Sequence, residues 1–191
     1  MARDRAVRLV IAVSAAVTFT SASFLVVEPL YARHVLHRPP SQFALFEAAA
    51  GTGAILAGLV VSRIRSRLSG GTILMAAAAG YGLAAYLFTG TTSLPVAYTG
   101  SFLWGAAGSV FGAVTTLQEV APMHARGRIM SISATLQSWT ETIGLPLGGV
   151  ALAALGVRPA ALVLAGVALA AGLIGMAIAT ALPADDVSRV T

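Results

Sequence analysis

Residues 71–90 read GTILMAAAAGYGLAAYLFTG, a stretch that contains no Asp, Glu, Lys, Arg or His. An α-helix needs about 20 mainly apolar residues to cross the hydrocarbon core of a bilayer. In that core every backbone polar group needs a partner, which only helices and closed barrels provide. Because the apolar residues are continuous rather than alternating, they do not fit a barrel strand. The stretch therefore predicts a transmembrane helix.

Five further segments of similar length and composition accompany this one. Hydrophobic residues make up 57% of the 191 residues and charged residues 10%, and the mean hydropathy is +0.85, far from the values of a soluble domain. We predict an all-α, polytopic membrane protein, with one six-helix bundle over residues 1–183 and a polar cytoplasmic tail at 184–191. The predicted spans are 9–32, 42–62, 71–90, 94–118, 129–153 and 159–182, with boundaries good to about 2–4 residues.

The basic residues lie between the spans rather than in one patch, so the net charge of +5 does not predict a nucleic-acid partner. Arginines gather on one side of the predicted bundle, which places both termini in the cytoplasm and the protein in the plasma membrane. That side carries Arg3, Arg5, Arg8, Arg63, Arg65, Arg67, Arg126, Arg128 and Arg189, and the other side carries Arg33, Arg38 and Arg158.

Several reaction classes are not expected. The chain has no cysteine, hence neither disulfides nor thiolate metal sites, and no metal or cofactor is predicted. Ser109 and His124 could suggest a serine hydrolase, but they lie at different membrane depths and no nucleophile motif surrounds the serine. The protein is not predicted to be an enzyme.

The six spans differ in polarity. Spans 71–90 and 159–182 contain no charged residue, whereas the other four carry polar groups. We therefore expect these two helices to face lipid and the other four to face protein or water. Prolines mark the expected breaks: Pro29 disturbs the end of the first span, and Pro95 and Pro159 lie near helix starts.

Ser14, Thr18, Ser21 and Glu28 fall on one face of the first span, at offsets of 0, 4, 7 and 14 residues. This stripe predicts the wall of a polar cavity, and Trp104 and Gln137 are the candidates from two other spans. The alternative is that the hydroxyl groups only bond the carbonyl four residues back or a neighbouring helix.

Glu141 is the strongest single candidate because it lies about 12 residues into the fifth span, near the bilayer midplane. A charge at that depth costs at least ~2.5–3.5 kcal/mol, so such residues usually face the bundle interior and mark ion pathways. We predict a proton-coupling carboxyl; the alternative is a neutral group that ties two helices together. Glu28 and Glu47 lie nearer the outer side, where pairing with Arg33 or Arg38 is expected.

Small residues recur at four-residue spacing in the fourth and fifth spans and predict faces where helices pack closely. They are Gly105, Ser109, Gly108, Gly112 and Thr116 in the fourth span and Gly144 and Gly148 in the fifth.

Residues 118–131, QEVAPMHARGRIMS, resemble the inner loop between the fourth and fifth helices of a half of a major facilitator superfamily transporter. The shared features are an acid, a proline and an Arg-Gly-Arg that opens the next helix: Glu119, Pro122, Arg126, Gly127 and Arg128. The fifth span is similar to the corresponding helix of drug exporters through Gly144, Pro146, Gly148 and Gly149. Residues 29–58 resemble the first hairpin of the C-terminal half of drug, macrolide and siderophore exporters. The loop at 62–67 departs from the family pattern, since it lacks the usual acid and second glycine.

The resemblance implies a twelve-helix fold made of two halves, each a pair of inverted three-helix repeats, of which this chain supplies one half. It further implies secondary active, proton-coupled export of small lipophilic molecules by alternating access. The expected partners are the bilayer, a small-molecule substrate, protons and a second six-helix half, from either a second copy or a separate chain. The alternatives are a non-transporting membrane subunit or scaffold and a truncated transporter remnant.

Overall fold

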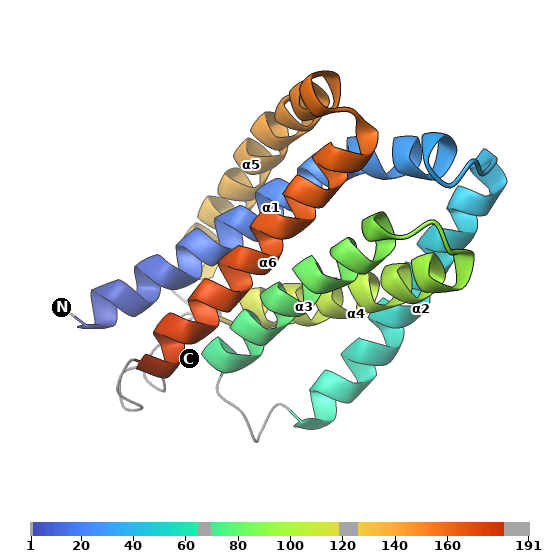
Figure 1. Ribbon diagram of the computed structural model, residues 1–191. Helices are drawn as coiled ribbons and strands as arrows, with labels where there is room; N and C mark the ends of the chain where they lie inside the picture. Colours follow the sequence, from blue (N-terminus) through green and yellow to red (C-terminus); the bar gives the residue numbers. More distant parts are fainter. Residues whose placement is uncertain (1, 65–69, 119–125, 182–191) are drawn as a thin grey trace.

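The computed structural model describes residues 2–64, 70–118 and 126–181, and the side chains at 2–10, 62, 64, 70–72, 113–118, 126–134, 136–137 and 179–181 are outside the description. The described residues form six helices and no strand, which confirms the all-helical prediction (Figure 1). The helices are α1 (Ala2–His34), α2 (Pro40–Ile64), α3 (Gly70–Gly90), α4 (Leu94–Gln118), α5 (Arg126–Leu155) and α6 (Val157–Ala181). The tail at 184–191 lies outside the described residues.

The helix boundaries at one end of the bundle follow from local backbone chemistry. Pro40 and Pro95 lie in the first turns of α2 and α4, where a missing N–H removes no helical hydrogen bond. Gly156 separates α5 from α6 with a φ of +81°, which a glycine adopts without strain, and its N–H donates to the Leu152 carbonyl at 2.9 Å. We call this end, which holds the connections after α1, α3 and α5, the loop end.

Pro29 does not break the first helix. It lies inside α1 near the end of the helix, which continues to His34, beyond the predicted end of the span at residue 32. Pro146 is likewise inside α5. Interior prolines are tolerated in membrane helices because neighbouring helices and polar side chains compensate for the missing hydrogen bond.

Four helices are long and apolar enough to cross a membrane: Ile11–His34, Pro40–Val61, Ile73–Gly90 and Val157–Ile178. The described residues of α4 and α5 do not contain a segment that meets the same criteria of length and hydropathy. α4 contains the polar stretch YTGS at 98–101, and α5 contains the polar stretch WTET at 139–142.

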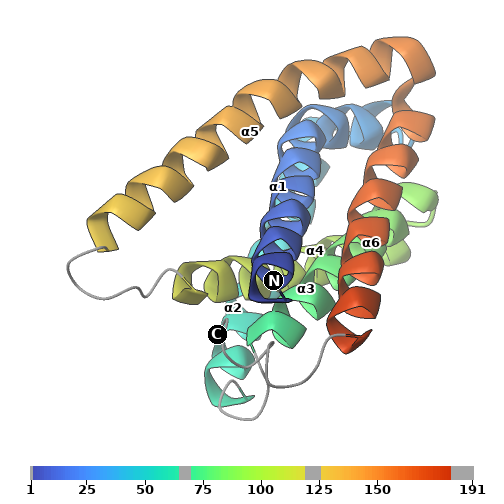
Figure 2. The same cartoon turned by 90° about the vertical axis from the view of Figure 1, so that its left-hand side faces the viewer.

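The six helices pack in the spatial order α5, α1, α6, α3, α4, α2, with extensive contact between each neighbouring pair. Figure 1 shows α5 next to α1 and α2 next to α4, and Figure 2 shows that α5 is inclined to α1 and diverges from it toward the start of α5. α1 and α4 are not among the helix pairs that pack extensively in the described chain. If α1 is exchanged with α4, α2 with α5 and α3 with α6, the same pairs of helices remain neighbours.

Glycines bring several of these pairs to backbone contact. A Cβ at Gly53 of α2 would collide with the Phe102 carbonyl oxygen, and one at Gly105 of α4 with the Ala50 carbonyl oxygen. Gly82 and Gly172 make the same kind of contact between α3 and α6. Close packing at Gly105, predicted from its spacing, is therefore present.

The expectation that α3 faces lipid is wrong. Its apolar window is 67% buried inside the bundle, against 17% for α2, the most exposed of the four candidate spans. Small side chains at Ala78, Ala84 and Ala85 let α3 pack between α4 and α6, leaving exposed positions such as Leu83 and Tyr86. A helix without charges suits a protein interior as well as it suits lipid.

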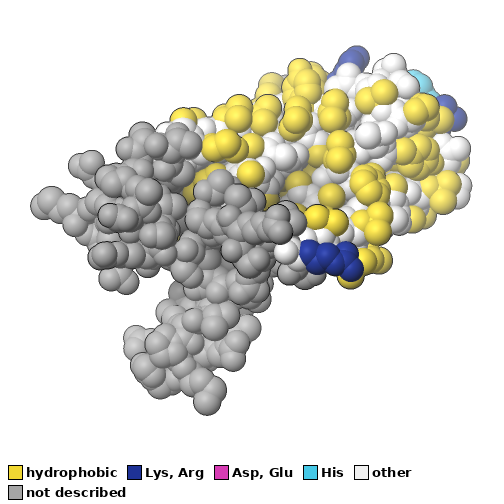
Figure 3. All heavy atoms as spheres, turned by 90° about the horizontal axis from the view of Figure 1, so that it is seen from below, with side chains coloured by type: hydrophobic (Ala, Val, Ile, Leu, Met, Phe, Trp, Pro, Cys, Tyr) yellow, Lys and Arg dark blue, Asp and Glu magenta, His cyan; other side chains and the backbone are white. Residues whose placement is uncertain are grey.

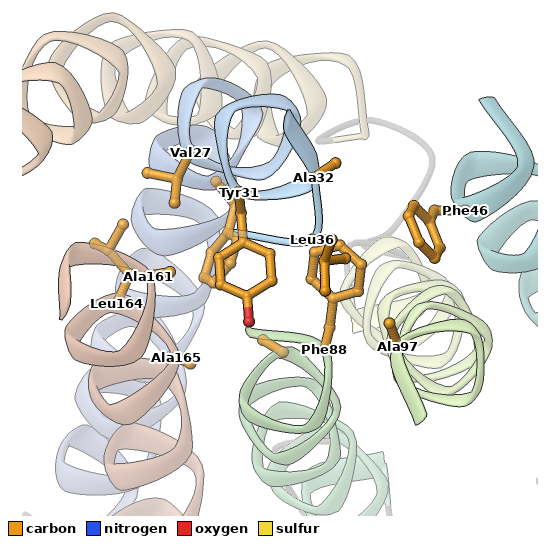
Figure 4. Packing of buried hydrophobic residues seen from close by; sticks show 12 residues of the cluster. Val27, Tyr31, Ala32, Leu36, Phe46, Phe88, Ala97, Ala161, Leu164 and Ala165 are labelled. Carbon is orange, nitrogen blue, oxygen red and sulfur yellow. The ribbon is translucent and has the colours of Figure 1, made fainter. Parts of the chain in front are cut away.

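The core forms two clusters along the bundle. The cluster at the loop end is rich in aromatic residues, with Tyr31, Phe46 and Phe88 fully or almost fully buried (Figure 4). The Tyr31 hydroxyl donates to the Thr91 carbonyl at 2.7 Å and so ties α1 to the end of α3. The second cluster joins the first half of α1, through Val13 and Val17, to the first half of α3. The Trp104 side chain packs against both clusters.

Candidate functional site

A pocket of about 290 Å³ lies between α1, α3, α4 and α5. We call it the central pocket, and it is lined by Val17, Thr18, Ser21, Ala22, Leu25, Tyr81, Gly108, Phe111, Gly112 and Glu141. It occupies the region where α1 and α4 leave room between them. Polar groups from three helices thus meet apolar and aromatic surface in one space.

Three of the predicted site residues meet in the central pocket: Thr18 and Ser21 from α1, and Glu141 from α5. Thr18 and Ser21 lie one turn apart, as their spacing required, and all three side chains are partly exposed. The described lining contains one carboxyl group and no basic side chain. The pocket therefore favours a neutral or positively charged ligand over an anion.

The other cavity candidates have different positions. Ser14 is half-buried but does not line the pocket. Trp104 lies behind the pocket wall, where its ring contacts the Tyr81 ring at a centroid distance of 5.4 Å. The side chain of Gln137 lies outside the described part of the chain.

Sequence reasoning missed Tyr81, Phe111 and Gly112 as lining residues. Tyr81 was overlooked because α3 was assigned to lipid, although its phenol is a polar group within an otherwise apolar stretch. Gly112 was assigned to a packing face, but no atom lies within 4 Å of the position that its Cβ would occupy. At this position a missing side chain makes room for the pocket.

Two hydrogen-bond donors at the pocket wall are buried and without a partner in the described structure: the Tyr81 hydroxyl and the Trp104 indole N–H. The Tyr81 hydroxyl lies near the Ser21 hydroxyl and the Trp104 indole, but the geometry does not meet that of a hydrogen bond. An unpartnered buried donor costs roughly 1–3 kcal/mol. Such atoms favour a polar ligand atom, a water molecule or a shifted side chain as the missing partner.

The two outer acids differ sharply. Glu47 of α2 is exposed, as a rim position requires, whereas Glu28 of α1 has only 3% of its surface exposed. Among the described residues no ion pair joins Glu28 to Arg33 or Arg38, in contrast to the pairing that the sequence suggested. Its position facing the interior of the bundle, rather than its depth along α1, separates it from water.

The helix-five motif contacts α1. A Cβ at Gly144 would lie 2.8 Å from the Ala22 Cβ, and one at Gly148 would lie 2.9 Å from the Ser23 carbonyl oxygen. The Ser23 hydroxyl donates to the Gly144 carbonyl at 2.8 Å and joins the two helices. Pro146 is exposed, and the Cβ position of Gly149 is open.

The inner-loop motif is only partly described. Glu119 and Pro122 lie outside the described residues. α5 begins at Arg126, where the Arg-Gly-Arg sequence starts, but the side chains of Arg126 and Arg128 are not described.

Apolar side chains cover much of the described surface (Figure 3). Large exposed ones occur on α2 and α5, including Ile55, Leu59, Trp139 and Val150. In a soluble protein a surface of this kind marks an interface, whereas here it fits lipid or another membrane helix.

The helices, the apolar surface and the candidate membrane spans indicate a helical membrane protein with a partly polar internal pocket. The family model of the Major Facilitator Superfamily matches residues 9–189, and the chain belongs to this superfamily. The comparisons with curated proteins and with solved structures gave no match. Members of the superfamily are membrane transporters rather than enzymes, so the general function is transport across a membrane.

Proposed function

We propose that the chain is one six-helix half of a proton-coupled exporter of small, lipophilic molecules, with the central pocket as its part of the substrate site. The observation that carries this proposal is the meeting of Thr18, Ser21 and Glu141 in a pocket lined by four helices. Its volume of about 290 Å³ is at the lower end of ligand pockets, which range over about 300–1,000 Å³. A second half would supply the opposite wall of a larger site.

The pocket suits exchange of a proton for a lipophilic cation. When the Glu141 carboxyl is protonated, the described lining has no net charge; loss of the proton leaves a carboxylate in a pocket that Tyr81 and Phe111 also line. A carboxylate and aromatic faces both attract an organic cation. One positive charge then leaves the site as another enters, which couples the two movements.

The packing order supports six membrane spans built as two three-helix repeats. Exchanging α1, α2 and α3 with α4, α5 and α6 reproduces the same set of neighbours. Inverted repeats of three helices are the units that rock against one another in transporters of this class. In this arrangement α4 and α5 cross the membrane with their polar residues facing the pocket rather than lipid.

The second half is a second copy of the chain or a separate six-helix chain, and it would cover the exposed faces of α2 and α5. Both helices are exposed on the side away from their partners α4 and α1. The arginine distribution supports cytoplasmic termini in a plasma membrane.

The test uses the purified chain in liposomes that carry a pH gradient, with ethidium as a lipophilic cationic probe. Ethidium should move against the direction of proton flow, and Glu141→Gln should reduce this flux at least tenfold while leaving the protein folded. Thr142→Ala on the same helix is the matched control, because Thr142 is exposed and its hydroxyl donates within α5.

Normal flux in Glu141→Gln would rule out the proton-carrier role. Absence of flux from the chain alone, together with a hetero-complex that survives mild solubilisation, would favour either a separate six-helix chain as the second half or a non-transporting scaffold. Native mass spectrometry of the detergent complex distinguishes a homodimer from these cases.

A further inference from the structure

Basic side chains gather at the loop end of the bundle. Figure 3 shows arginine and histidine side chains at the end of the molecule away from the grey atoms. Val35 and Val157 pack against the same core cluster, so the connection after α1 and the start of α6 lie at the same end. We call the basic group of these two segments the basic rim, and its members are Arg33, His34, His37, Arg38 and Arg158.

The charge of the basic rim is not neutralised by ion pairs within the described residues. The described acids of α1 and α2 are Glu28, which is almost completely buried, and Glu47, and neither forms an ion pair with the rim. The Arg38 Nε is buried without a hydrogen-bond partner in the described structure. Arg158 is exposed and donates to the Gly90 carbonyl at 3.3 Å, which leaves its charge unpaired. This end of the bundle therefore has an excess of positive charge.

Helix capping does not account for the whole basic rim. Arg33 and His34 lie in the last turn of α1, where a cation favours the negative end of the helix dipole. His37 and Arg38 follow the end of α1, and Arg158 lies in the first turn of α6, where the dipole disfavours a cation. A ligand with negative charge would favour all five positions.

The segment that carries four of these side chains is held in one shape. Leu36 is buried in the core cluster, and its N–H donates to the Tyr31 carbonyl at 3.1 Å. The Arg38 N–H donates to the Ala32 carbonyl at 2.9 Å. His37 turns the chain with a φ of +52°, which is uncommon for a residue other than glycine. Rigid presentation of this kind lowers the entropy that binding costs.

Exposed apolar side chains lie next to the basic rim. Leu45 of α2 and Val163 of α6 are both more than half exposed. Each lies five residues into the bundle from the rim side, Leu45 after Pro40 and Val163 after Arg158, or about 7.5 Å along its helix. Cations above an apolar helix surface match the two parts of a phospholipid, a charged headgroup above acyl chains.

We propose that the basic rim binds the phosphate headgroup of an anionic phospholipid, whose acyl chains pack beside Leu45 and Val163. Guanidinium groups match the geometry of phosphate oxygens and can donate two hydrogen bonds to them. The partner is a lipid rather than a soluble phosphate because the cations border a surface that itself favours acyl chains. This contact is separate from the central pocket and does not depend on the proposed transport function.

The experiment measures lipid occupancy beside the rim. The full chain has no natural cysteine, so Leu45→Cys can be labelled with bimane and placed in phosphatidylcholine bilayers. Phosphatidylglycerol or phosphatidylcholine with brominated acyl chains is then added, since bromine quenches a nearby fluorophore. Phosphatidylglycerol should occupy this place at least about tenfold more strongly, because each basic residue near an anionic surface contributes roughly a fivefold factor.

Replacement of Arg33 and Arg38 tests whether the rim causes this preference. Arg33→Gln combined with Arg38→Gln should reduce it to less than about twofold, and each single change should reduce it by roughly fivefold. If the double variant does not accumulate as a folded protein, the single variants decide the outcome. The matched control is a bimane at Val60→Cys, an exposed position near the other end of α2, where the lipid preference should not change.

Three results would overturn the proposal. They are equal quenching by the two lipids beside Leu45→Cys in the parent protein, a preference that survives both arginine replacements, and displacement of the brominated phosphatidylglycerol by millimolar glycerol phosphate. The last result would show a site for soluble phosphates instead of a lipid site. None of the three would alter the ethidium flux assay, on which the proposed transport function depends.

Discussion

Two glycines of α4, seven residues apart and on similar faces of the helix, have opposite surroundings. At Gly105 the backbone of α2 occupies the place of a side chain, whereas at Gly112 that place is open and borders the central pocket. The first region is a seam that holds two helices together, and the second is a space kept empty of side chains. The same small residue therefore allows close helix packing in one region and leaves the central pocket open in the other.

The seams explain how a chain with few strong polar contacts holds a pocket open. Lipid is as apolar as the helix surfaces, so association depends on close packing and on a few hydrogen bonds between helices. α4 is fixed to α2 through Gly53 and Gly105, and α1 is fixed to α5 through Gly144 and Gly148. The two helices that supply most of the pocket lining are therefore each fixed to another helix, and α1 and α4 do not pack extensively against one another in the described chain.

The largest expected effect is at the seam. Gly53→Ala should destabilise the protein by about 3 kcal/mol, the upper end of the usual cost of overpacking, because the new methyl group meets the Phe102 backbone, which cannot rotate away. Gly51→Ala, two residues earlier on the same helix and with open space around it, should be neutral or stabilising by up to about 1 kcal/mol. Thermal unfolding in detergent measures both, and equal stability of the two variants would contradict the seam.

Filling the pocket should affect binding rather than folding. Gly112→Leu places a side chain in the open space beside Phe111 and should weaken ethidium binding at least tenfold, with little change in thermal stability. Gly149→Leu, an equally open site on α5 outside the pocket, is the control and should bind normally. Ethidium fluorescence titration provides the affinities, and normal binding by Gly112→Leu would show that the ligand site is elsewhere.

A smaller effect is expected where one hydrogen bond supports a seam. Ser23→Ala removes the bond from α1 to the Gly144 carbonyl and should cost about 0.6–1.5 kcal/mol, the range for hydrogen bonds between membrane helices. Thr142→Ala, whose hydroxyl donates only within α5 at 2.7 Å to the Ser138 carbonyl, should cost less. Thermal unfolding of the two variants measures both losses of stability. A loss for Thr142→Ala as large as that for Ser23→Ala would contradict the assignment of the Ser23 hydrogen bond to the contact between α1 and α5.

The helices were predictable because long apolar segments have few other ways to satisfy their backbone hydrogen bonds in a bilayer. Thr18 and Ser21 were predictable as neighbours because helical spacing puts them on one face, and Glu141 because a deep carboxyl needs an interior position. Which helices pack against one another was not predictable, because spacing alone does not show whether a glycine such as Gly112 contacts a neighbouring helix or borders an open space. For the same reason Tyr81 was missed: absence of charge in α3 did not distinguish burial against helices from contact with lipid.

The most direct test of the central pocket as the substrate site uses the natural absence of cysteine from the chain. A single cysteine at Thr18→Cys should react with a small maleimide, and saturating ethidium should slow this reaction at least fivefold. A cysteine at Gly149→Cys, outside the pocket, should react at the same rate with and without ethidium. Equal protection at both positions, or no protection at residue 18, would contradict the account.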